Sequence, residues 1–454
     1  MAGYDMRTGN IAGHMMRFAV PLVIGNFFQL TYNAVDSIVV GRCVGDAAQA
    51  AIGVANPLMN VLIFFIVGAC NGIGVILSEC YGAGEHERLK KEFATAAVFG
   101  TGVVLLFSAL FFLLAPLLLT LISTPPEIMA QTTGYMRIII MGLCFTFLYN
   151  VSACALRSLG DAKTPLLFLV LSSCLNIGLD VLFVVRYSFG VAGAALGTVI
   201  SQAVSAFLCM AVIQSGNPYL RLGRKDLRID ARLLKRLLQY SVSTGMQKIT
   251  LNVGKVLIQS FVNPLGVSAV AAFNAVNRVD DFVFQPEQSI ASAMTTFVAQ
   301  NRGAGEKERI RKCLWCGLLM ELLYWVLIGA AVFFSAEGIM GLFTAKKGGS
   351  MAAIGTAYLR YMSFFYVMPG ITNWLQGYVR GFGKMNVCLT ATFVQMVGRV
   401  GAGAFLIPAY GIVGVAFSCL AGWVLMLLFE IPYCVKKKYL TPSSFYSTLS
   451  KCRE

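Results

Sequence analysis

Charged residues are scarce in this chain. Asp, Glu, Lys and Arg make up 13% of its 454 residues, apolar residues make up 57%, and the mean hydropathy is +0.73. So little charge argues against a soluble fold of this length. Apolar runs recur about every 35 residues instead, and each is long enough to cross a bilayer. The composition therefore predicts an all-α polytopic membrane protein.

The chain also lacks the groups that enzymes and ATP-driven pumps use. It has two His residues and shows no nucleophile or metal-ligand set. The glycine-rich loops at Gly82 and Gly303 lack the GxxxxGK[ST] pattern that cradles a nucleotide phosphate, and neither follows a strand, so tight turns between helices explain them. We expect no enzymatic activity and no cofactor. Energy must then come from an ion gradient.

Basic residues outnumber acidic ones, and their placement indicates topology rather than nucleic-acid binding. The formal net charge is +15, yet with a cytosolic N-terminus 26 of the 36 Lys and Arg fall in cytosolic loops and tails, and four in outer loops. By the positive-inside rule, both termini are expected to be cytosolic. The first span is too long for a cleaved signal peptide. Twelve spans are expected, beginning near residues 15, 50, 93, 127, 164, 191, 234, 268, 311, 350, 386 and 412.

The chain repeats itself with a period of about 221 residues. Tyr81-Gly-Ala-Gly-Glu-His-Glu-Arg88 returns as Arg302-Gly-Ala-Gly-Glu-Lys-Glu-Arg309, with glycines aligned. Each half holds six spans and begins on the cytosolic side, so we expect two parallel six-helix repeats around a central cavity, an architecture typical of transporters. The expected domains are an N-lobe over residues 1–213, a basic cytosolic linker over 214–233 and a C-lobe over 234–454.

One acid lies inside the first span, within Gly25–Val40. An ionised Asp at the centre of a spanning helix costs about 3 kcal/mol on insertion scales, so Asp36 needs a partner or a purpose. Gln29, Tyr32 or Asn33, and Asp36 follow helical spacing and form one polar stripe on an apolar helix. This stripe should face protein or water rather than lipid.

The fifth span carries a second acid. Asn176 and Asp180 are four residues apart and share one helix face. Thr198 in the sixth span, with Tyr135 and Asn150 in the fourth, offers further oxygen groups within the first half. Carboxylate, amide and hydroxyl oxygens suit a hard cation.

Two acids in one low-dielectric site cannot both stay ionised without a cation. The first half is therefore predicted to bind Na⁺, at Asp36, Asn176, Asp180 and Thr198, or to hold a proton on one acid. The residues do not choose between the two ions. A polar network that only holds the helices together is the alternative. Neither acid has an acidic counterpart 221 residues further along the chain.

The second half carries a different polar set on its first two spans: Lys255, Asn274, Arg278, Asp280, Asp281, Gln285 and Glu287. Lys255 and Asp280 lie at depths from which they could pair, either to neutralise each other or to contact a substrate. The residues expected to line a substrate cavity are Gln29 and Tyr32 from the first half and Asn274, Asp281 and Gln285 from the second.

Pro21 lies in the first span, four residues before Gly25. The backbone hydrogen bond that a proline cannot make allows a bend there. We expect a hinge at Pro21 that moves the Asp36 segment when the charge of this acid changes.

The ordered set of these features resembles the multidrug and toxic compound extrusion (MATE) family, of the bacterial kind, over essentially the whole chain. The resemblance depends on Pro21 with Asp36, the Gly82 and Gly303 loops, Leu156-Arg157-Ser-Leu-Gly160 with Pro165, Asn176 with Asp180, Gln285-Pro286, and twelve spans in two halves.

This resemblance implies a secondary active antiporter, in which Na⁺ or H⁺ enters while an amphipathic, often cationic organic compound, a drug or a metabolite, leaves by alternating access. It implies a first-half cation site at Asp36, Asn176, Asp180 and Thr198. Some bacterial members carry functional acids in the seventh and tenth spans. This chain has none there, so no second-half cation site is expected.

The expected setting is a bacterial cytoplasmic membrane, and the expected partners are a small organic substrate and the lipid bilayer, with no nucleic acid and with the protein as a monomer. A flippase for lipid-linked precursors, of the same superfamily, is the alternative. Such a flippase would be expected to have a strongly cationic cavity for phosphates and often additional spans. Twelve spans and two first-half acids favour the exporter.

Overall fold

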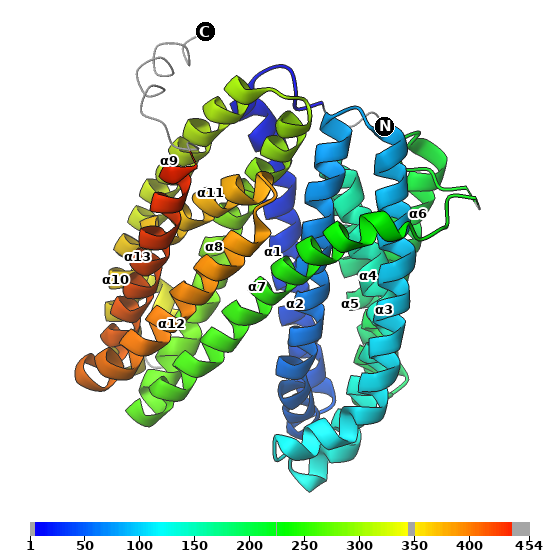
Figure 1. The fold of residues 1–454 in the computed structure, drawn as a ribbon. Helices are drawn as coiled ribbons and strands as arrows, with labels where there is room; N and C mark the ends of the chain where they lie inside the picture. Colours follow the sequence, from blue (N-terminus) through cyan, green and yellow to red (C-terminus); the bar gives the residue numbers. More distant parts are fainter. Residues whose placement is uncertain (1–4, 224, 344–349, 438–454) are drawn as a thin grey trace. The chain divides into compact units, whose positions relative to one another are not determined.

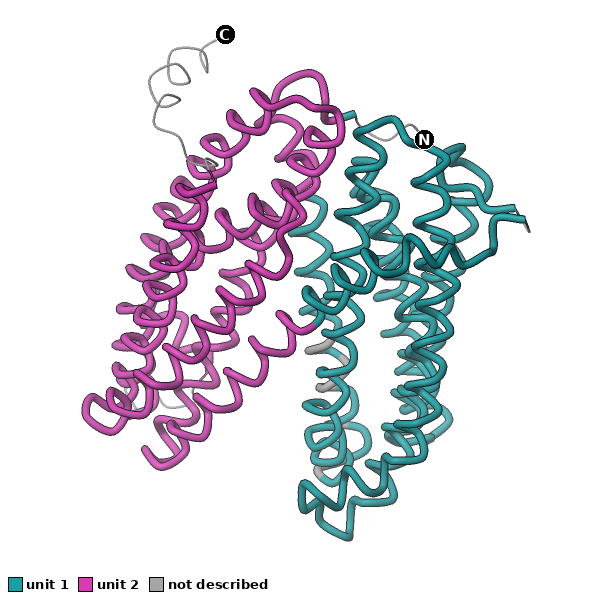
Figure 2. Tube along the Cα trace, viewed as in Figure 1, with its two compact units in different colours: residues 1–5, 21–245 teal, residues 6–20, 246–454 magenta. Residues whose placement is uncertain are grey.

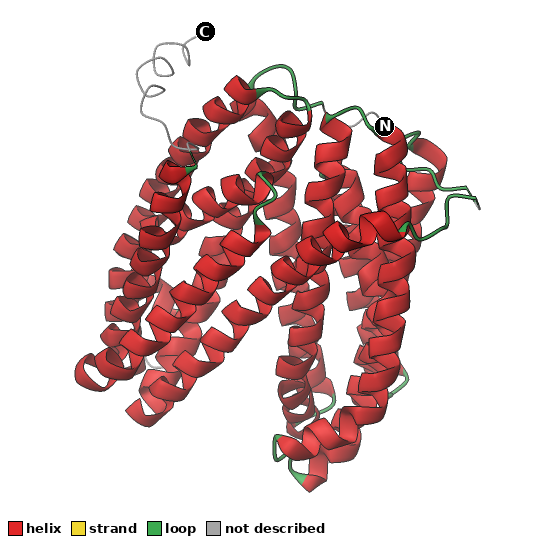
Figure 3. Cartoon of the chain, viewed as in Figure 1, coloured by secondary structure: helices red, strands yellow, loops and turns green. Residues whose placement is uncertain are grey.

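The protein is built from long helices (Figure 1). The computed structural model describes residues 5–223, 225–343 and 350–437, without side chains at positions 33, 34, 36–38, 42 and 46. No strand occurs among these residues (Figure 3). The expectation of an all-α polytopic fold is confirmed.

The helices of the first half alternate with short turns, as expected for neighbouring membrane spans. They are α1 (Ile11–Cys43), α2 (Asp46–Gly82), α3 (His86–Leu121), α4 (Pro126–Ser158), α5 (Lys163–Asp180), the π-helical η1 (Val181–Arg186) that continues α5, and α6 (Gly190–Gly216).

The helices of the second half follow the same plan, except that its fourth span is divided. They are α7 (Ala231–Val262), the short 3-10 helix η2 (Asn263–Leu265), α8 (Val267–Gly303), α9 (Lys307–Gly341), α10 (Ser350–Phe365), α11 (Val367–Gly381), α12 (Met385–Tyr410) and α13 (Ile412–Lys436).

Twelve spans account for these helices when η1 is counted with α5, and α11 with α10. Nine of the described helices are long and apolar enough to cross a membrane by length and composition alone. The other three spans are α7 and α8, where polar residues lower the hydropathy, and the divided tenth span, whose halves α10 and α11 have 16 and 15 residues. The expected starts match the helix starts closely; the third differs most, expected from residue 93 and beginning at His86.

The chain forms two compact units, and each contains part of α1 and part of α7 (Figure 2). Unit 1 comprises residues 1–5 and 21–245, and unit 2 comprises residues 6–20 and 246–454. The divisions therefore fall inside helices, between Val20 and Pro21 and between Gly245 and Met246. The lobe boundaries expected at residues 213 and 234 remain predictions.

Glycines let α2 and α7 approach closely inside unit 1. A methyl group on Gly68 would lie 2.6 Å from the Thr244 carbonyl oxygen, and one on Gly72 would lie 2.6 Å from the Tyr240 carbonyl oxygen. Small residues four positions apart allow such backbone contact between membrane helices. The start of α7 is thereby fixed on α2.

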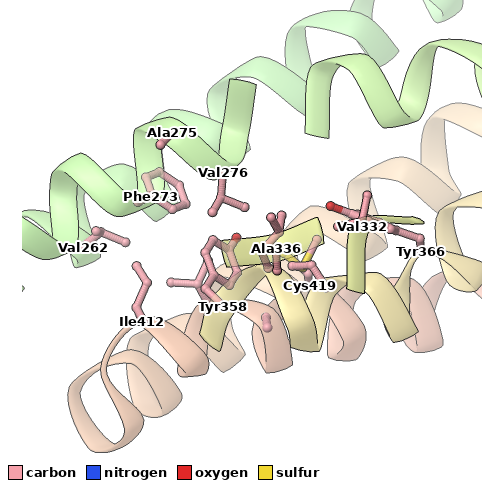
Figure 4. Packing of buried hydrophobic residues seen from close by; sticks show 14 of the residues in the cluster. Val262, Phe273, Ala275, Val276, Val332, Ala336, Tyr358, Tyr366, Ile412 and Cys419 are labelled. Carbon is pink, nitrogen blue, oxygen red and sulfur yellow. The ribbon is translucent and has the colours of Figure 1, made fainter. Parts of the chain in front are cut away.

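The core of unit 2 is a continuous apolar cluster from α7, α8, α9, α10, α12 and α13. Figure 4 shows Val262 and Ile412 at one end of this cluster and Val332 and Tyr366 at the other, with Tyr358 between them. Tyr358 and Tyr366 are fully buried. This packing holds the α10–α11 junction in place.

The segment before α1 is held inside unit 2 by α8 and α9. The Met6 N–H donates to Gln300 Oε1 at 3.3 Å, and Asn301 Nδ2 donates to the Met6 carbonyl at 3.3 Å. Arg309 donates to the Gly9 carbonyl at 3.0 Å. We call residues 5–10 the N-terminal arm.

The segment before α7 is held in unit 1 by α3. Lys90 Nζ lies 2.7 Å from Asp226 Oδ2, and the Asp230 N–H donates to Thr95 Oγ1 at 3.2 Å. Lys90 and the Gly223 N–H hold the pKa of the exposed Asp226 below its usual value, because both donate hydrogen bonds to the ionised carboxylate. Each half thus has an anchored segment ahead of its first helix.

Candidate cation-binding site

Asp180 lies at the end of α5, where the regular helix becomes the π-helical η1. Its side chain is fully buried. A methyl group on Gly197 of α6 would lie 2.6 Å from Asp180 Oδ1, so the carboxylate occupies space that any side chain at position 197 would fill. Single π-helical turns are frequent at functional sites because they change which residues face a helix neighbour.

Asn176 and Thr198 meet beside this carboxylate. Asn176 Nδ2 donates to Thr198 Oγ1 at 3.5 Å, and the Thr198 hydroxyl donates to the Ala194 carbonyl at 3.1 Å. Asn176 is 2% exposed, and its Oδ1 has no hydrogen-bond partner among the described residues. The site therefore holds an amide oxygen that is free to bind a cation, within one turn of Asp180.

The pairing of α5 with α6 is secured by two further hydrogen bonds. Ser172 Oγ donates to the Ser201 carbonyl at 3.0 Å, and Ser205 Oγ donates to the Phe168 carbonyl at 3.1 Å. Hydrogen bonds of this kind between membrane helices fix their rotation, and so they fix which side chains face each other. The structure brings Asn176, Asp180 and Thr198 together, and their role in cation binding remains a prediction.

Asp36 is in α1, but its side chain lies outside the described residues. Gly25, eleven residues earlier in the same helix, packs on α5: a methyl group on Gly25 would lie 3.1 Å from Leu166 and 3.2 Å from Leu169. Both helices are expected to run from the cytosolic side outward, so equal counts along each reach equal depth. Eleven residues beyond Gly25, position 36 comes level with the end of α5. The role of Asp36 remains a prediction.

Tyr135 and Asn150 lie on α4 at different depths. Fifteen positions separate them, which is about 22 Å along a helix, so a compact site can include one of them at most. Asn150 Nδ2 donates to the Thr146 carbonyl of its own helix, and Tyr135 is buried. Their roles stay predictions.

Pro21 lies at the division between the two compact units, and the polar stripe on α1 follows it in the same helix. Pro21 is buried and is the first residue of α1 that belongs to unit 1. Further along, Gln29 is exposed and Tyr32 is half-buried. The hinge and the cavity roles expected of these residues remain predictions.

In unit 2 the expected pair of Lys255 with Asp280 is wrong. Lys255 Nζ lies 3.3 Å from Asp281 Oδ1, and both side chains are partly exposed. Asp280 is buried and accepts a hydrogen bond of 2.7 Å from the Tyr366 hydroxyl. Adjacent helical positions point about 100° apart, so the side chain that meets Lys255 depends on the rotation of α8.

The remaining cavity residues expected on α8 differ in exposure. Asn274 is exposed and Gln285 is half-buried. Asp281, already paired with Lys255, lies on the same face as both because the three positions follow helical spacing. A role for them in substrate binding stays a prediction.

Two glutamates, Glu287 of α8 and Glu321 of α9, come together in unit 2 although the expected sites include neither. Both are buried and both face Gly370 of α11. Glu321 stands alone in an apolar stretch of the ninth span, and the cost that singles out Asp36 applies equally to it. A search for lone acids within apolar spans would therefore have found Glu321 from the sequence.

A family model described as MatE matches residues 21–182 and 244–403. The chain belongs to the MatE family. The first matched segment starts at Pro21, where unit 1 resumes, and the second starts next to the division within α7. The two matched segments lie in the two halves of the duplication.

Similar proteins cover nearly the whole chain. Probable multidrug resistance protein YpnP of Bacillus subtilis is 30% identical over 397 residues, 87% of this MatE chain and 88% of that protein. Probable multidrug resistance protein NorM of Thermotoga maritima is 25% identical, over 92% of this chain and 89% of that protein.

A solved structure has the same fold. It is described as the outward-facing conformation of a multidrug resistance MATE family transporter of the MOP superfamily. It aligns with a TM-score of 0.89 over 96% of this chain and 99% of that chain, at 21% identity. The twelve-helix MATE fold, a multi-pass membrane architecture, is therefore shown for this chain.

Proposed function

We propose that this protein is a secondary active antiporter that exports amphipathic organic compounds, cationic ones in particular, in exchange for Na⁺ or H⁺. The observation that supports this most is the fully buried Asp180 in a spanning helix, with the Asn176 amide and Thr198 hydroxyl beside it. A buried charge in a membrane persists where it serves ion or substrate movement. The names of the similar proteins support drug export as the class of activity.

The chemistry of the site fits a coupling ion. Asp180 supplies a carboxylate, Asn176 a free amide oxygen and Thr198 a hydroxyl oxygen, which together suit a hard monovalent cation. Asp36 adds a second carboxylate if its side chain turns toward α5. With both acids in place, Na⁺ or a proton relieves their mutual repulsion.

The helices α1 and α7 provide the link between ion binding and movement. Each contributes to both compact units, and Pro21 marks the change of unit in α1. Pro21 removes a backbone hydrogen bond there, so α1 can bend without breaking others. Occupation of the site by an ion then changes the position of the Asp36 segment, and alternating access follows from that bend.

The proposed setting is a bacterial cytoplasmic membrane with both termini cytosolic, where the protein acts as a monomer. The basic loops support this orientation, because 26 of 36 Lys and Arg lie on the side assigned to the cytosol. The cargo is expected to contact Gln29 and Tyr32 in unit 1 and Asn274, Asp281 and Gln285 in unit 2.

Transport in liposomes tests the proposal. The full chain is reconstituted, Na⁺ and proton gradients are imposed separately, and cationic dyes are followed. We expect gradient-driven dye movement that Asp36→Asn and Asp180→Asn each abolish. Glu127→Gln, at an exposed acid in the first turn of α4, is the matched control and should transport normally. Movement that survives both Asn substitutions contradicts the mechanism.

A lipid-linked precursor flippase is the second candidate, favoured by the charges on α7 and α8. Lys248, Lys255 and Arg278 outnumber Asp281 on the partly exposed faces of these helices, which suits a phosphate group. A fluorescent isoprenoid diphosphate in the same liposomes separates the two functions. Its movement between leaflets, without movement of any dye, would favour the flippase.

A further inference from the structure

The tenth span is interrupted in its middle. α10 ends at Phe365 and α11 begins at Val367, with Tyr366 in a turn between them. Pro369 has no N–H to offer the Phe365 carbonyl, and the Gly370 N–H reaches the Tyr366 carbonyl at 3.4 Å, a long hydrogen bond. One turn of backbone inside a membrane span is therefore only weakly bonded to itself.

Glu287 and Glu321 face this turn from two different helices. A methyl group on Gly370 would lie 3.6 Å from Glu321 Oε2 and 4.0 Å from Glu287 Oε1. The two side chains are 0% and 1% exposed, and their four carboxylate oxygens have no hydrogen-bond partner in the described part of the chain. Two unpartnered carboxylates thus converge on a point that the glycine keeps open.

The fold fixes this convergence, because α11 is bonded to both neighbouring helices. Thr295 Oγ1 of α8 donates to the Gly377 carbonyl at 3.0 Å. Trp374 Nε1 of α11 donates to the Leu314 carbonyl of α9 at 2.6 Å. These bonds lie within three turns of Gly370, so α8 and α9 cannot move away from α11 here without breaking them.

The groups around the two glutamates are polar or acidic. Asn373 approaches Glu287, Tyr324 lies near both glutamates, and Asp280 and Tyr366 lie on the Glu287 side. The Tyr324 hydroxyl already donates to a backbone carbonyl of α8, and the Tyr366 hydroxyl to Asp280. Within the described ranges, neither glutamate forms an ion pair with a Lys or Arg.

Two buried carboxylates without solvent or counter-charges cannot both be ionised, because their repulsion adds to the cost of burying each charge. A Na⁺ ion would need several further oxygen ligands, and among the described side chains only the Asn373 amide is shown beside Glu287. A proton needs only the two carboxylates. We propose that Glu287 and Glu321 form a proton-binding site in unit 2, separate from the site at Asp180.

Because of the position of this site, binding or loss of the proton changes the repulsive force between α8 and α9. The glutamates are on α8 and α9, which pack against each other and against α11, so loss of the proton pushes two helices apart at the weakly bonded turn near Gly370. Binding of a proton removes that force. This deepens the antiport proposed above and its place in the transport cycle rests on that proposal, whereas proton binding itself does not.

Infrared spectroscopy of the purified full chain in lipid tests proton binding without any need for transport. The C=O stretch of protonated carboxyl groups is followed while the pH is raised, in H₂O and in D₂O. We expect a protonated-carboxyl band in the wild type that Glu287→Gln and Glu321→Gln each remove in part, with about one proton fewer released per molecule. Gln resembles a protonated Glu in shape, which favours folding of both variants.

Two controls accompany this titration. Glu337→Gln, at an exposed acid on the same helix as Glu321, should leave the band unchanged. In the wild type, isotope-labelled glutamate should shift the band, which assigns it to Glu rather than Asp even where a variant does not fold.

Three outcomes would overturn the assignment: a band that is unchanged in both Gln variants, a band insensitive to labelled glutamate, or a band that disappears when Na⁺ replaces choline at constant pH. Absence of dye transport by the wild type, with the band and its dependence on the two glutamates intact, would count against the antiporter alone.

Discussion

Tyr366 donates its hydroxyl to Asp280, with 2.7 Å between the two oxygens. Both side chains are buried in unit 2, and Tyr366 occupies the turn that divides the tenth span. A carboxylate that loses its donor in such a place keeps the full cost of its burial. The bond therefore ties the interruption of the span to α8.

Tyr366→Phe should destabilise the protein by about 1.5 to 3 kcal/mol, because Asp280 is left without its donor. The measurement is the melting temperature of the purified protein in detergent. Tyr361→Phe, at a partly exposed tyrosine five residues earlier, should have little effect. Adding Asp280→Asn to Tyr366→Phe should recover part of the loss, since it removes the buried charge. Equal melting temperatures for the two Phe variants would contradict this account.

Thr198→Val should weaken coupling-ion binding, because Asn176 loses the oxygen that orients its amide. A lost hydrogen bond of about 1 kcal/mol corresponds to a roughly fivefold higher half-saturating ion concentration for transport. Thr198→Ser keeps the hydroxyl and should stay close to the wild type. If Val and Ser behave alike, Thr198 has no part in the site.

That Asn176 and Asp180 lie together could be predicted because their geometry is local. Asn176 and Asp180 share a face through helical spacing alone, and a lone acid in an apolar run stands out by its cost. Nine of the twelve spans follow from hydropathy in the same way. The span starts follow where apolar runs begin, except that α3 begins at His86, before its apolar run.

Features that depend on how helices pack could not be predicted. Whether Lys255 meets Asp280 or Asp281 depends on the rotation of α8, and the sequence near both is the same. The π-helical residues Val181–Arg186 contain no Gly or Pro, whereas Pro369 and Gly370 were a visible signal for the interruption at Tyr366.

Gly72→Ala should destabilise unit 1 by about 1 to 3 kcal/mol, because its methyl group would meet a backbone oxygen of α7 that no side-chain rotation can move. Gly102→Ala on α3 is the matched control. It has open space at this position, and the better helix propensity of Ala should leave stability unchanged or raised. Melting temperatures in detergent compare the two. If Gly72→Ala were as stable as Gly102→Ala, α2 and α7 would be able to move apart at little cost.

Arg309→Lys should release the N-terminal arm although the charge is kept. Arg309 donates to the carbonyls of Met6, Thr8 and Gly9 at once, and a lysine cannot reproduce that fork. Hydrogen exchange at residues 5–10 should become at least roughly tenfold faster, since each lost bond of this kind contributes about 1.5 kcal/mol or more. Arg311→Ala, two residues further on, should leave exchange in the arm unchanged. Unchanged exchange in Arg309→Lys would show that other contacts hold the arm.

The segment before α7 should loosen in acid. Lys90 lowers the pKa of Asp226, so the carboxylate is more easily ionised in the folded protein than in the unfolded chain. Its contribution is therefore complete above the usual pKa range of Asp and is lost as the pH falls through the lowered value. Protection from hydrogen exchange at residues 225–230, relative to the intrinsic rate at each pH, should fall only in strong acid, and Asp226→Asn should show the lower protection at every pH. The effect should shrink in high salt, because this ion pair is exposed and screened. Exchange in Asp226→Asn that matches the wild type at neutral pH would contradict a role for this ion pair.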